Sequence, residues 1–387
     1  GPSAELGIWI DPDTQIPHLA WQLMIRPNWR ERWFYVVEAA DGTVLDFYNG
    51  TVFDGPATGR GVDVAGETQT VNVYEVGDGF VMIDASRATF ADEQPNLLND
   101  PRGAIWTLDL RGNSFSSDAS VFNVVSSDSS WDDPVAVSAH HHAGLAFQYF
   151  FDVHGRRGID NRDGTIISIV HVTEDDQPME NAFWNGAFIA YGDGDVGFRP
   201  LAAALDVVAH EMTHGVIERT VNLEYRFQSG ALNESFADVF GVMVDRDDWT
   251  LAEDIANESV FASGVLRDME DPHNGSDADD FSWQPAHMDE FVELEITEDN
   301  GGVHVNSGIP NRACFLVAEA LGRKKTEQIY YRILDARYLN SRSNFVDLRL
   351  AALRATADLF GESGTEIDGV AAAFDRVGIV GNEGESA

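Results

Sequence analysis

The stretch VVAHEMTHGVIE, Val207 to Glu218, decides how the rest of this chain must be organised. It contains His210, Glu211 and His214 in the pattern H-E-x-x-H, and the surrounding apolar residues recur at helical spacing. Two histidines four residues apart lie on the same face of a helix, so both imidazoles can reach one metal ion. Glu211 directly follows the first histidine, and we expect it to take a proton from a bound water rather than to ligate the metal.

A catalytic zinc ion takes three protein ligands and a water, so the third ligand must come from elsewhere in the chain. The segment SGALNESFADVFGVMV, residues 229–244, has a second helical pattern and offers Glu234, with Asp238 one turn later. Asp238 can accept the outer N–H group of a ligand histidine and fix its tautomer, as metal sites routinely require. The sequence therefore predicts a zinc site on two helices, in which Glu234 joins the two histidines.

These motifs resemble those of the thermolysin-like neutral metallopeptidases. The resemblance extends to NAFWNGAFIAYGDGD (181–195), LRDMEDP (266–272) and DNGGVHVNSGIPN (299–311). Order and spacing agree with that family from about residue 58 to about residue 380. A metzincin is excluded, because that class requires Gly and His at the positions held here by Ile217 and Thr220.

The resemblance implies an α+β fold with a β-rich N-terminal domain, an α-helical C-terminal domain and the active-site cleft between them. Short strand patterns and turns fill residues 51–204, interrupted by one helical pattern at 137–155. Helical periodicity dominates residues 205–387. We therefore expect the two catalytic domains to occupy 51–204 and 205–387.

Residues 1–50 resemble the end of the propeptide that precedes the catalytic domain in this family. Strands are predicted at HLAWQLMIR (18–26), RWFYVVEA (32–39) and TVLDFYN (43–49), with a hairpin turn at Asp41-Gly42. The maturation junction is then expected near Asn49 to Thr58, in a segment rich in Gly and Pro. The alternative is a hairpin that belongs to the first catalytic domain.

The resemblance also implies which residues assist catalysis. A tetrahedral oxyanion needs hydrogen-bond donors, and these would be Tyr225 and His304, with Asp299 orienting the histidine. Arg267 would bind a substrate carbonyl on the leaving-group side. Taken singly, a buried tyrosine or histidine is more often a satisfied core residue, but the surrounding motif DNGGVH favours the catalytic role here.

Substrate binding is expected along an edge strand and in one apolar pocket. By resemblance, the Asn181 side chain and the Ala182 carbonyl would bind the peptide backbone, while Phe183 and Trp184 would only pack. Five apolar residues match the family's pocket for the residue after the scissile bond: Phe198, Leu201, Val207, Leu251 and Leu266. A large hydrophobic residue is expected there, since its burial contributes roughly 1.5–3 kcal/mol. The alternative is that these side chains only form core.

Calcium binding is expected at a group of carboxylates, Asp206, Asp245, Asp248 and Glu253, because a hard cation prefers an all-oxygen shell. Thr250 stands where the family's double site has another carboxylate, so one calcium ion is expected rather than two. In so acidic a chain, the same carboxylates could also cluster without an ion.

Composition narrows the possible partners. The chain has 65 acidic and 25 basic residues, a net charge of −40, which argues against nucleic acid or an anionic membrane as partner. The sequence contains no run of eighteen apolar residues, which argues against a membrane span. The acidity indicates a surface adapted to concentrated salt, with ordinary solubility as the alternative. Cys314 is the only cysteine, which excludes an intramolecular disulfide and predicts a buried hydrophobic role.

Three consecutive histidines, His140 to His142, point about 100° apart on the helix predicted at 137–155, so at most one can face a given ion. We interpret them as structural or surface residues.

The combined prediction is a secreted, extracellular and monomeric zinc endopeptidase that also binds calcium. It would cleave protein or peptide substrates before a large hydrophobic residue and would bind its own propeptide. The alternative is a catalytically silent or propeptide-inhibited calcium-binding interaction module of the same fold. The natural substrate and the fate of residues 1–50 stay open at this point.

Overall fold

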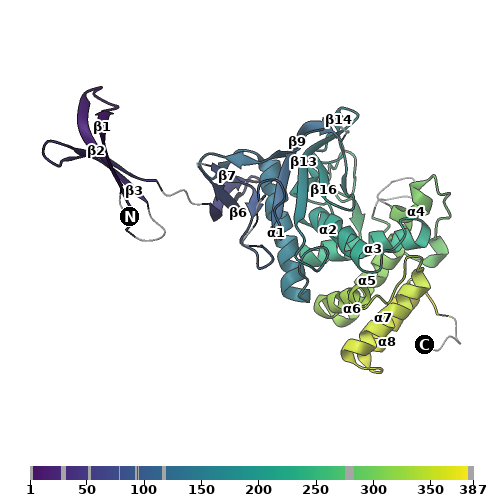
Figure 1. Ribbon diagram of the computed structural model, residues 1–387. Helices are drawn as coiled ribbons and strands as arrows, with labels where there is room; N and C mark the ends of the chain where they lie inside the picture. Colours follow the sequence, from purple (N-terminus) through teal and green to yellow (C-terminus); the bar gives the residue numbers. More distant parts are fainter. Residues whose placement is uncertain are drawn as a thin grey trace. The chain divides into compact units, whose positions relative to one another are not determined.

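The computed structural model describes residues 3–27, 32–50, 54–77, 79–91, 94, 96–115, 119–274 and 283–381 (Figure 1). The chain divides into two compact units, of which the first comprises residues 1–55 together with 75–79. The predicted maturation junction includes residues 51–53, which lie outside the described residues.

The first unit contains a four-stranded antiparallel sheet in the order β1-β2-β3-β4. Its strands are β1 (Ser3–Ile10), β2 (Pro17–Ile25), β3 (Trp33–Glu38) and β4 (Val44–Asn49). The sequence predicted the last three but missed β1, whose centre carries Gly7, a residue type depleted in strands. The hairpin turn at Asp41-Gly42 is confirmed: Gly42 has a φ of 81°, and the Thr43 amide donates to the Asp41 carboxylate at 3.0 Å.

The β-rich half of the second unit contains a mixed seven-stranded sheet with the main order β10-β9-β13-β16-β15. Its strands are β8 (Ile83–Asp84), β9 (Ile105–Ser114), β10 (Phe122–Asn123), β13 (Ile166–Glu174), β14 (Gln177–Pro178), β15 (Ala182–Trp184) and β16 (Ile189–Gly192). β9, β13 and β16 are parallel, whereas β15 pairs antiparallel with β16. β15 therefore ends this order as an edge strand.

A second sheet of five strands has the order β11-β7-β6-β5-β12. Its strands are β5 (Gly55–Val62), β6 (Thr68–Val76), β7 (Gly79–Val81), β11 (Val125–Ser126) and β12 (Ser130–Trp131). Two of its buried valines, Val71 and Val73, join the core that also contains residues of α1 (Pro134–His154).

Helix α1 begins three residues earlier than the pattern predicts, because Asp133 caps it and Pro134 fits its first position. Two of its histidines bond inside the fold. His140 lies 2.8 Å from the Thr107 hydroxyl and 2.7 Å from the Asn72 carbonyl, and His142 lies 3.0 Å from the Ala202 carbonyl. Burial lowers the pKa of both, that of His142 to about 4, so these neutral side chains serve the packing of α1.

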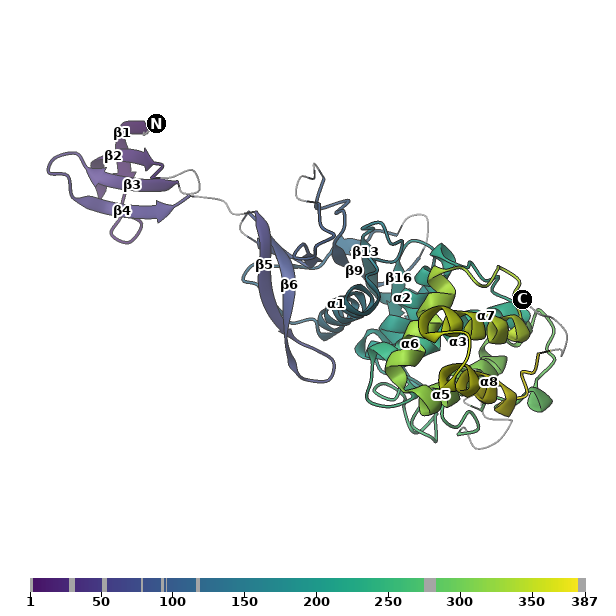
Figure 2. The ribbon, with the colours of Figure 1, turned by 90° about the horizontal axis from the view of Figure 1, so that it is seen from below.

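The second half is helical, as the sequence predicts. It contains η1 (Leu201–Ala203), α2 (Leu205–Arg219), α3 (Phe227–Val244), η2 (Met288–Glu290), α4 (Asp299–Asn306), α5 (Gly308–Leu321), α6 (Arg323–Asp335), α7 (Phe345–Phe360) and α8 (Thr365–Arg376), with the short strands β17 (Thr250–Leu251) and β18 (Arg267–Asp268). Helix α3 packs against α2 on one side and contacts α5, α6 and α7 on the other (Figures 1 and 2). The expected α+β architecture is confirmed. Within the described ranges, no helix has both the length and the apolar character needed to cross a membrane.

His171 connects the large sheet to the start of α1. On β13, its Nδ1 lies 2.8 Å from Asp193 Oδ2 and its Nε2 lies 3.1 Å from Oδ2 of Asp133, the cap of α1. Hydrogen bonds to Asp133 and Asp193 raise the pKa of His171 to about 10. The imidazolium therefore pairs with both carboxylates at neutral pH.

These ion pairs predict a pH-dependent stability. His171 has a pKa of about 10 in the folded protein and of about 6.5 in the unfolded chain. Its contribution to stability is therefore complete below pH 6.5 and is lost as the pH rises through about 10. The free energy of unfolding should fall more in the parent protein than in His171→Gln between these pH values. The difference should be on the order of 1 kcal/mol, because solvent screens the partly exposed Asp193. Urea unfolding at both pH values measures it, and parallel pH profiles would contradict the assignment.

Candidate active site

A cavity of about 530 Å³ lies between the β-rich and helical halves of the second unit. It is lined by most of the residues singled out in the sequence: Asn181, Ala182, Phe198, Leu201, Val207, His210, Glu211, His214, Tyr225, Glu234, Leu251, Leu266, Arg267 and His304. Asp238 and Asp299 lie behind this lining and contact His210 and His304. Segments up to about 120 residues apart in sequence thus converge on one space.

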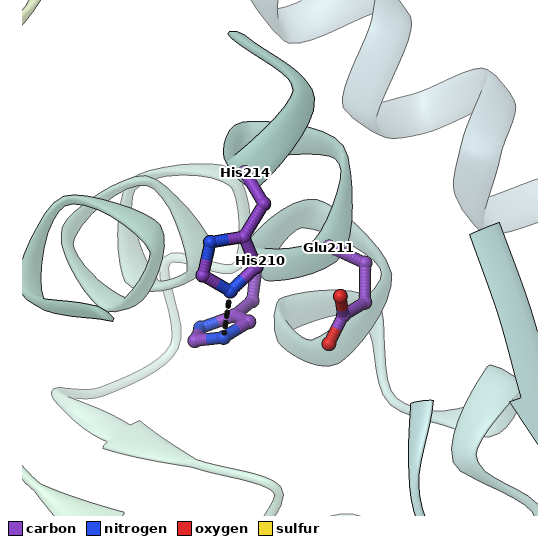
Figure 3. Close-up of side chains that lie close together, drawn as sticks. All are labelled: His210, Glu211 and His214. Carbon is purple, nitrogen blue, oxygen red and sulfur yellow. Dashed lines mark hydrogen bonds between the residues drawn. The ribbon is translucent and has the colours of Figure 1, made fainter. Parts of the chain in front are cut away.

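The centre of the cavity holds two histidines and a carboxylate. His210 and His214 lie one turn apart on α2, with their Nε2 atoms 3.0 Å apart (Figure 3). Glu234 on α3 places its carboxylate oxygens 3.6 Å from His210 Nε2 and 3.5 Å from His214 Nε2. Glu234 Oε2 is buried and has no hydrogen-bond partner among the residues that the structure describes. Two imidazole nitrogens and one carboxylate at this spacing fit a tetrahedral zinc ion with one open position.

Charge keeps Glu234 ionised. Burial raises its pKa, but the nearby His304, His214 and His210 outweigh burial and lower the pKa to about 2. A buried carboxylate that stays ionised beside two imidazoles is a suitable ligand for a divalent cation.

Each histidine is held from behind by a side chain of α3. Asp238 Oδ1 lies 2.8 Å from His210 Nδ1, as the sequence predicts, and Asn233 Oδ1 lies 2.8 Å from His214 Nδ1. Asn233 was not predicted, although it directly precedes Glu234. Both contacts fix the outer nitrogen of a histidine and leave its Nε2 free to face the ion.

Glu211 lies beside the two imidazoles but is held separately. Its carboxylate projects from α2 next to them in Figure 3, and Oε2 accepts a hydrogen bond from the backbone N–H of Trp184 at 2.8 Å. The indole N–H of Trp184 donates to Glu218 at 2.8 Å. Trp184 was expected only to pack, whereas in the structure its backbone N–H is a hydrogen-bond partner of Glu211.

Tyr225 and His304 meet at Glu234. The Tyr225 hydroxyl donates to Glu234 Oε1 and lies 3.0 Å from His304 Nε2. Asp299 Oδ1 lies 2.5 Å from His304 Nδ1 and its other oxygen accepts the His304 amide at 2.8 Å. The charge of Glu234, opposed by burial and assisted by Asp299, raises the pKa of His304 to about 9. His304 therefore offers an N–H group at neutral pH.

Arg267, on β18, lines the cavity and is fixed by Asp238. Its guanidinium donates two hydrogen bonds to the Asp238 carboxylate, at 2.9 and 2.7 Å. Burial raises the pKa of Asp238, but Arg267 and His210 outweigh burial and hold that pKa well below its usual range. One carboxylate therefore positions both a histidine and an arginine of the site.

All five apolar pocket residues line the cavity, and Glu180 and Ala252 are among the lining residues that were not predicted. Leu201 and Leu251 belong to the buried core, while Phe198, Val207 and Leu266 are partly buried against it. These side chains therefore both line the cavity and pack in the core, so the two roles considered from the sequence, substrate pocket and core, are compatible.

The predicted calcium ligands are only partly brought together. Asp245 and Glu253 place carboxylate oxygens within 4.8 Å of each other and of Asp254, which was not predicted. Asp206 accepts the Val207 amide at 2.8 Å and also the Ala252 amide, and Asp248 accepts the Thr250 amide at 2.7 Å. Burial is the main cause that raises the pKa of Asp206 to about 7 and of Glu253 to about 8.

Comparisons with known proteins follow the same division of the chain. The sequence profile described as "Thermolysin metallopeptidase, catalytic domain" matches residues 58–218, and "Thermolysin metallopeptidase, alpha-helical domain" matches residues 221–379. The bacillolysin of Brevibacillus brevis is 37% identical over 389 aligned positions, which cover 98% of this chain and 67% of that protein.

Two further relatives are similar. The extracellular elastase of Staphylococcus epidermidis is 36% identical, with 90% of this chain and 63% of that protein covered. The solved structure of the precursor of protealysin, a metalloproteinase from Serratia proteamaculans, has a TM-score of 0.64 at 30% identity. That match covers 73% of this chain and 89% of the solved chain.

The two residues behind the histidines should contribute unequally to zinc affinity. Asp238→Ala removes a charged partner of His210, so the zinc dissociation constant should rise roughly 10- to 100-fold. Asn233→Ala removes a neutral partner of His214, and its effect should be smaller because neutral hydrogen bonds are weaker. Competition with a chromophoric chelator measures both constants. An unchanged constant in Asp238→Ala would remove that carboxylate from the metal site.

Proposed function

Because this chain belongs to the thermolysin family of metallopeptidases and is a zinc metalloendopeptidase, we propose that His210, His214 and Glu234 bind the zinc ion. The observation that carries this proposal is the approach of Glu234 to within 3.6 Å of both imidazole Nε2 atoms in the cavity. When bound, the zinc ion supplies a water of lowered pKa and polarises the substrate carbonyl.

Glu211 acts as the general base and then as the general acid. Its carboxylate takes a proton from the attacking water and gives it to the leaving amine. The hydrogen bond from the Trp184 amide orients the carboxylate and leaves Oε1 for this proton. Glu211 thus performs proton transfer rather than ligation.

Tyr225 and His304 stabilise the negative charge that develops on the substrate carbonyl oxygen. Their polar atoms lie 3.0 Å apart and both face Glu234, so one oxyanion can accept from both. The raised pKa of His304, about 9, keeps its donor N–H in place at neutral pH. Arg267, fixed by Asp238, binds a substrate carbonyl on the leaving-group side.

The substrate peptide binds along β15 in an extended conformation. An edge strand offers backbone donors and acceptors to any peptide sequence, and the Asn181 side chain and the Ala182 carbonyl supply two of these contacts. The apolar pocket then selects a large hydrophobic residue after the scissile bond. Five side chains support this preference: Phe198, Leu201, Val207, Leu251 and Leu266.

One calcium ion binds at the acidic loop after α3. Asp245, Glu253 and Asp254 approach one another, and the raised pKa values of Asp206 and Glu253 reflect burial together with mutual repulsion. A hard divalent cation would offset this repulsion and accept carboxylate oxygens as ligands. The ion would stabilise the fold beside the substrate pocket, since Leu251 belongs to both regions.

The enzyme is secreted and carries the end of a propeptide in residues 1–50. The similarity to an extracellular elastase supports secretion, and the grouping of residues 1–55 in a compact unit, with only 75–79 from the rest of the chain, supports a removable segment. The enzyme would cleave itself within residues 50–61, and this cleavage would release the segment that contains β1 to β4.

Replacing Glu211 by Gln should abolish peptide hydrolysis while zinc stays bound, because the variant loses the proton acceptor but keeps all three ligands. The loss in kcat should be at least about 100-fold. Zinc content, turnover and N-terminal sequence are measured on one sample. The parent enzyme should yield a chain beginning within residues 50–61, while the variant keeps Gly1. Joint loss of zinc and activity would show that Glu211 is a ligand.

Salt and calcium should stabilise the protein independently. At about 0.01 M ionic strength the Debye length is about 30 Å, so surface carboxylates of a chain with a net charge of −40 repel one another, and at 1 M it falls to about 3 Å. The melting temperature of the Glu211→Gln variant, which cannot digest itself, should rise with sodium chloride at saturating calcium. It should rise again with calcium at fixed salt, because calcium binds only the folded state. A flat salt response would reject the adaptation to salt, and a flat calcium response would reject the calcium site.

A further inference from the structure

We propose that Glu180 is a positioning residue for substrate specificity, because it holds the backbone that carries Phe198 into the pocket. The inference rests on the proposed pocket for the residue after the scissile bond. Glu180 lines the same cavity as Phe198 and immediately precedes Asn181.

The Glu180 carboxylate accepts three successive backbone N–H groups. Oε1 accepts from Val196 at 2.6 Å, and Oε2 accepts from Gly197 at 2.8 Å and from Phe198 at 3.1 Å. A concave turn of consecutive amides is an anion-binding arrangement, and here the anion is a side chain of the same protein. Hydrogen bonds to a charged acceptor are about twice as strong as neutral ones.

The fit leaves no space between carboxylate and backbone. A Cβ atom added to Gly197 would lie 2.7 Å from Glu180 Oε2, so the position requires glycine while the carboxylate stays in place. On the other side, Asn257 donates its amide to the Gly197 carbonyl and its side chain to the Val196 carbonyl, both at 2.9 Å. The backbone before Phe198 is thus fixed from two sides, and Glu180 supplies the contacts on the cavity side.

Phe198 is the pocket residue that depends most directly on this arrangement. Its ring packs on Phe261 with centroids 4.8 Å apart and lines the cavity. Loss of the Glu180 contacts would free three amides and let Phe198 move, and a large substrate side chain would then lose packing. Cleavage of a substrate with a small side chain at this position would be unaffected, because that side chain does not reach Phe198.

Glu180 also joins the two parts of the substrate site. It directly precedes the segment of Asn181 and β15, where the peptide backbone is proposed to bind, and its carboxylate holds the pocket wall. Because its oxygens are occupied by backbone amides, we assign it no direct recognition of a cationic side chain.

The test compares peptides that differ only in the residue after the scissile bond: phenylalanine, leucine, alanine or lysine. In Glu180→Ala, kcat/KM for the phenylalanine and leucine peptides should fall roughly tenfold, as expected for the loss of one apolar packing group. The alanine peptide should change less than about twofold. Glu180→Gln keeps the shape but weakens the hydrogen bonds, so it should lie between Glu180→Ala and the parent enzyme.

Asp195→Asn is the matched control, because it removes an exposed carboxylate from the same loop and should leave the ratio of phenylalanine to alanine peptides unchanged. Zinc content and melting temperature establish that each variant is folded. If Glu180→Ala does not fold, the proposal is tested by the ratio of kcat/KM between the phenylalanine and alanine peptides in Glu180→Gln.

An unchanged ratio of kcat/KM between the phenylalanine and alanine peptides would overturn the proposal, whether all peptides lose activity equally or only the lysine peptide does. A parent enzyme without any preference for phenylalanine or leucine over alanine would instead contradict the proposed pocket itself. That measurement needs no variant, so the two failures are distinguishable.

Discussion

The positions of several side chains in the site depend on the fully buried carboxylate of Asp238. It touches His210 on α2, Arg267 on β18 and the side-chain amide of Asn311 on α5. A charge in the interior is tolerated only when its partners are all in place, and removing one partner of a buried pair typically costs roughly 3–5 kcal/mol. The orientation of a metal-facing histidine and the position of the cavity's arginine are therefore coupled to the packing of three elements.

A second constraint is the close approach of β15 to α2. A Cβ atom at Gly215 would lie 2.6 Å from Ile159 Cγ2 and 3.2 Å from the Trp184 ring, so glycine is required in the middle of this helix. Glycine there costs roughly 1 kcal/mol of helix propensity. In return, the Trp184 amide reaches Glu211 on the same helix. The strand proposed to bind substrate and the proposed catalytic base are thus fixed relative to each other.

The sequence could predict what helical geometry alone determines. The spacing of His210 and His214 fixes one face of α2, and the pattern around Glu234 predicts a second helix. The motifs also predicted that Asp238 and Glu234 meet the histidines, but other contacts between elements were not predictable, because no local pattern specifies that Asn233 faces His214 or that the Trp184 amide faces Glu211. The calcium expectation shows the same limit: carboxylates were recognisable by type, but only the fold shows that Asp254 joins the cluster while Asp206 bonds to backbone amides.

Charge is organised differently at the surface and in the cavity. The net charge of −40 belongs largely to exposed side chains, whose interactions salt screens within a Debye length. In the cavity, the buried Arg267 pairs with Asp238 at 2.7 Å, and the half-exposed His304 pairs with Asp299 at 2.5 Å. Buried or partly buried pairs are screened much less than exposed ones. The acidic surface therefore makes folding sensitive to salt, while the electrostatics of proton transfer and oxyanion binding depend on close partners whose interactions salt screens less.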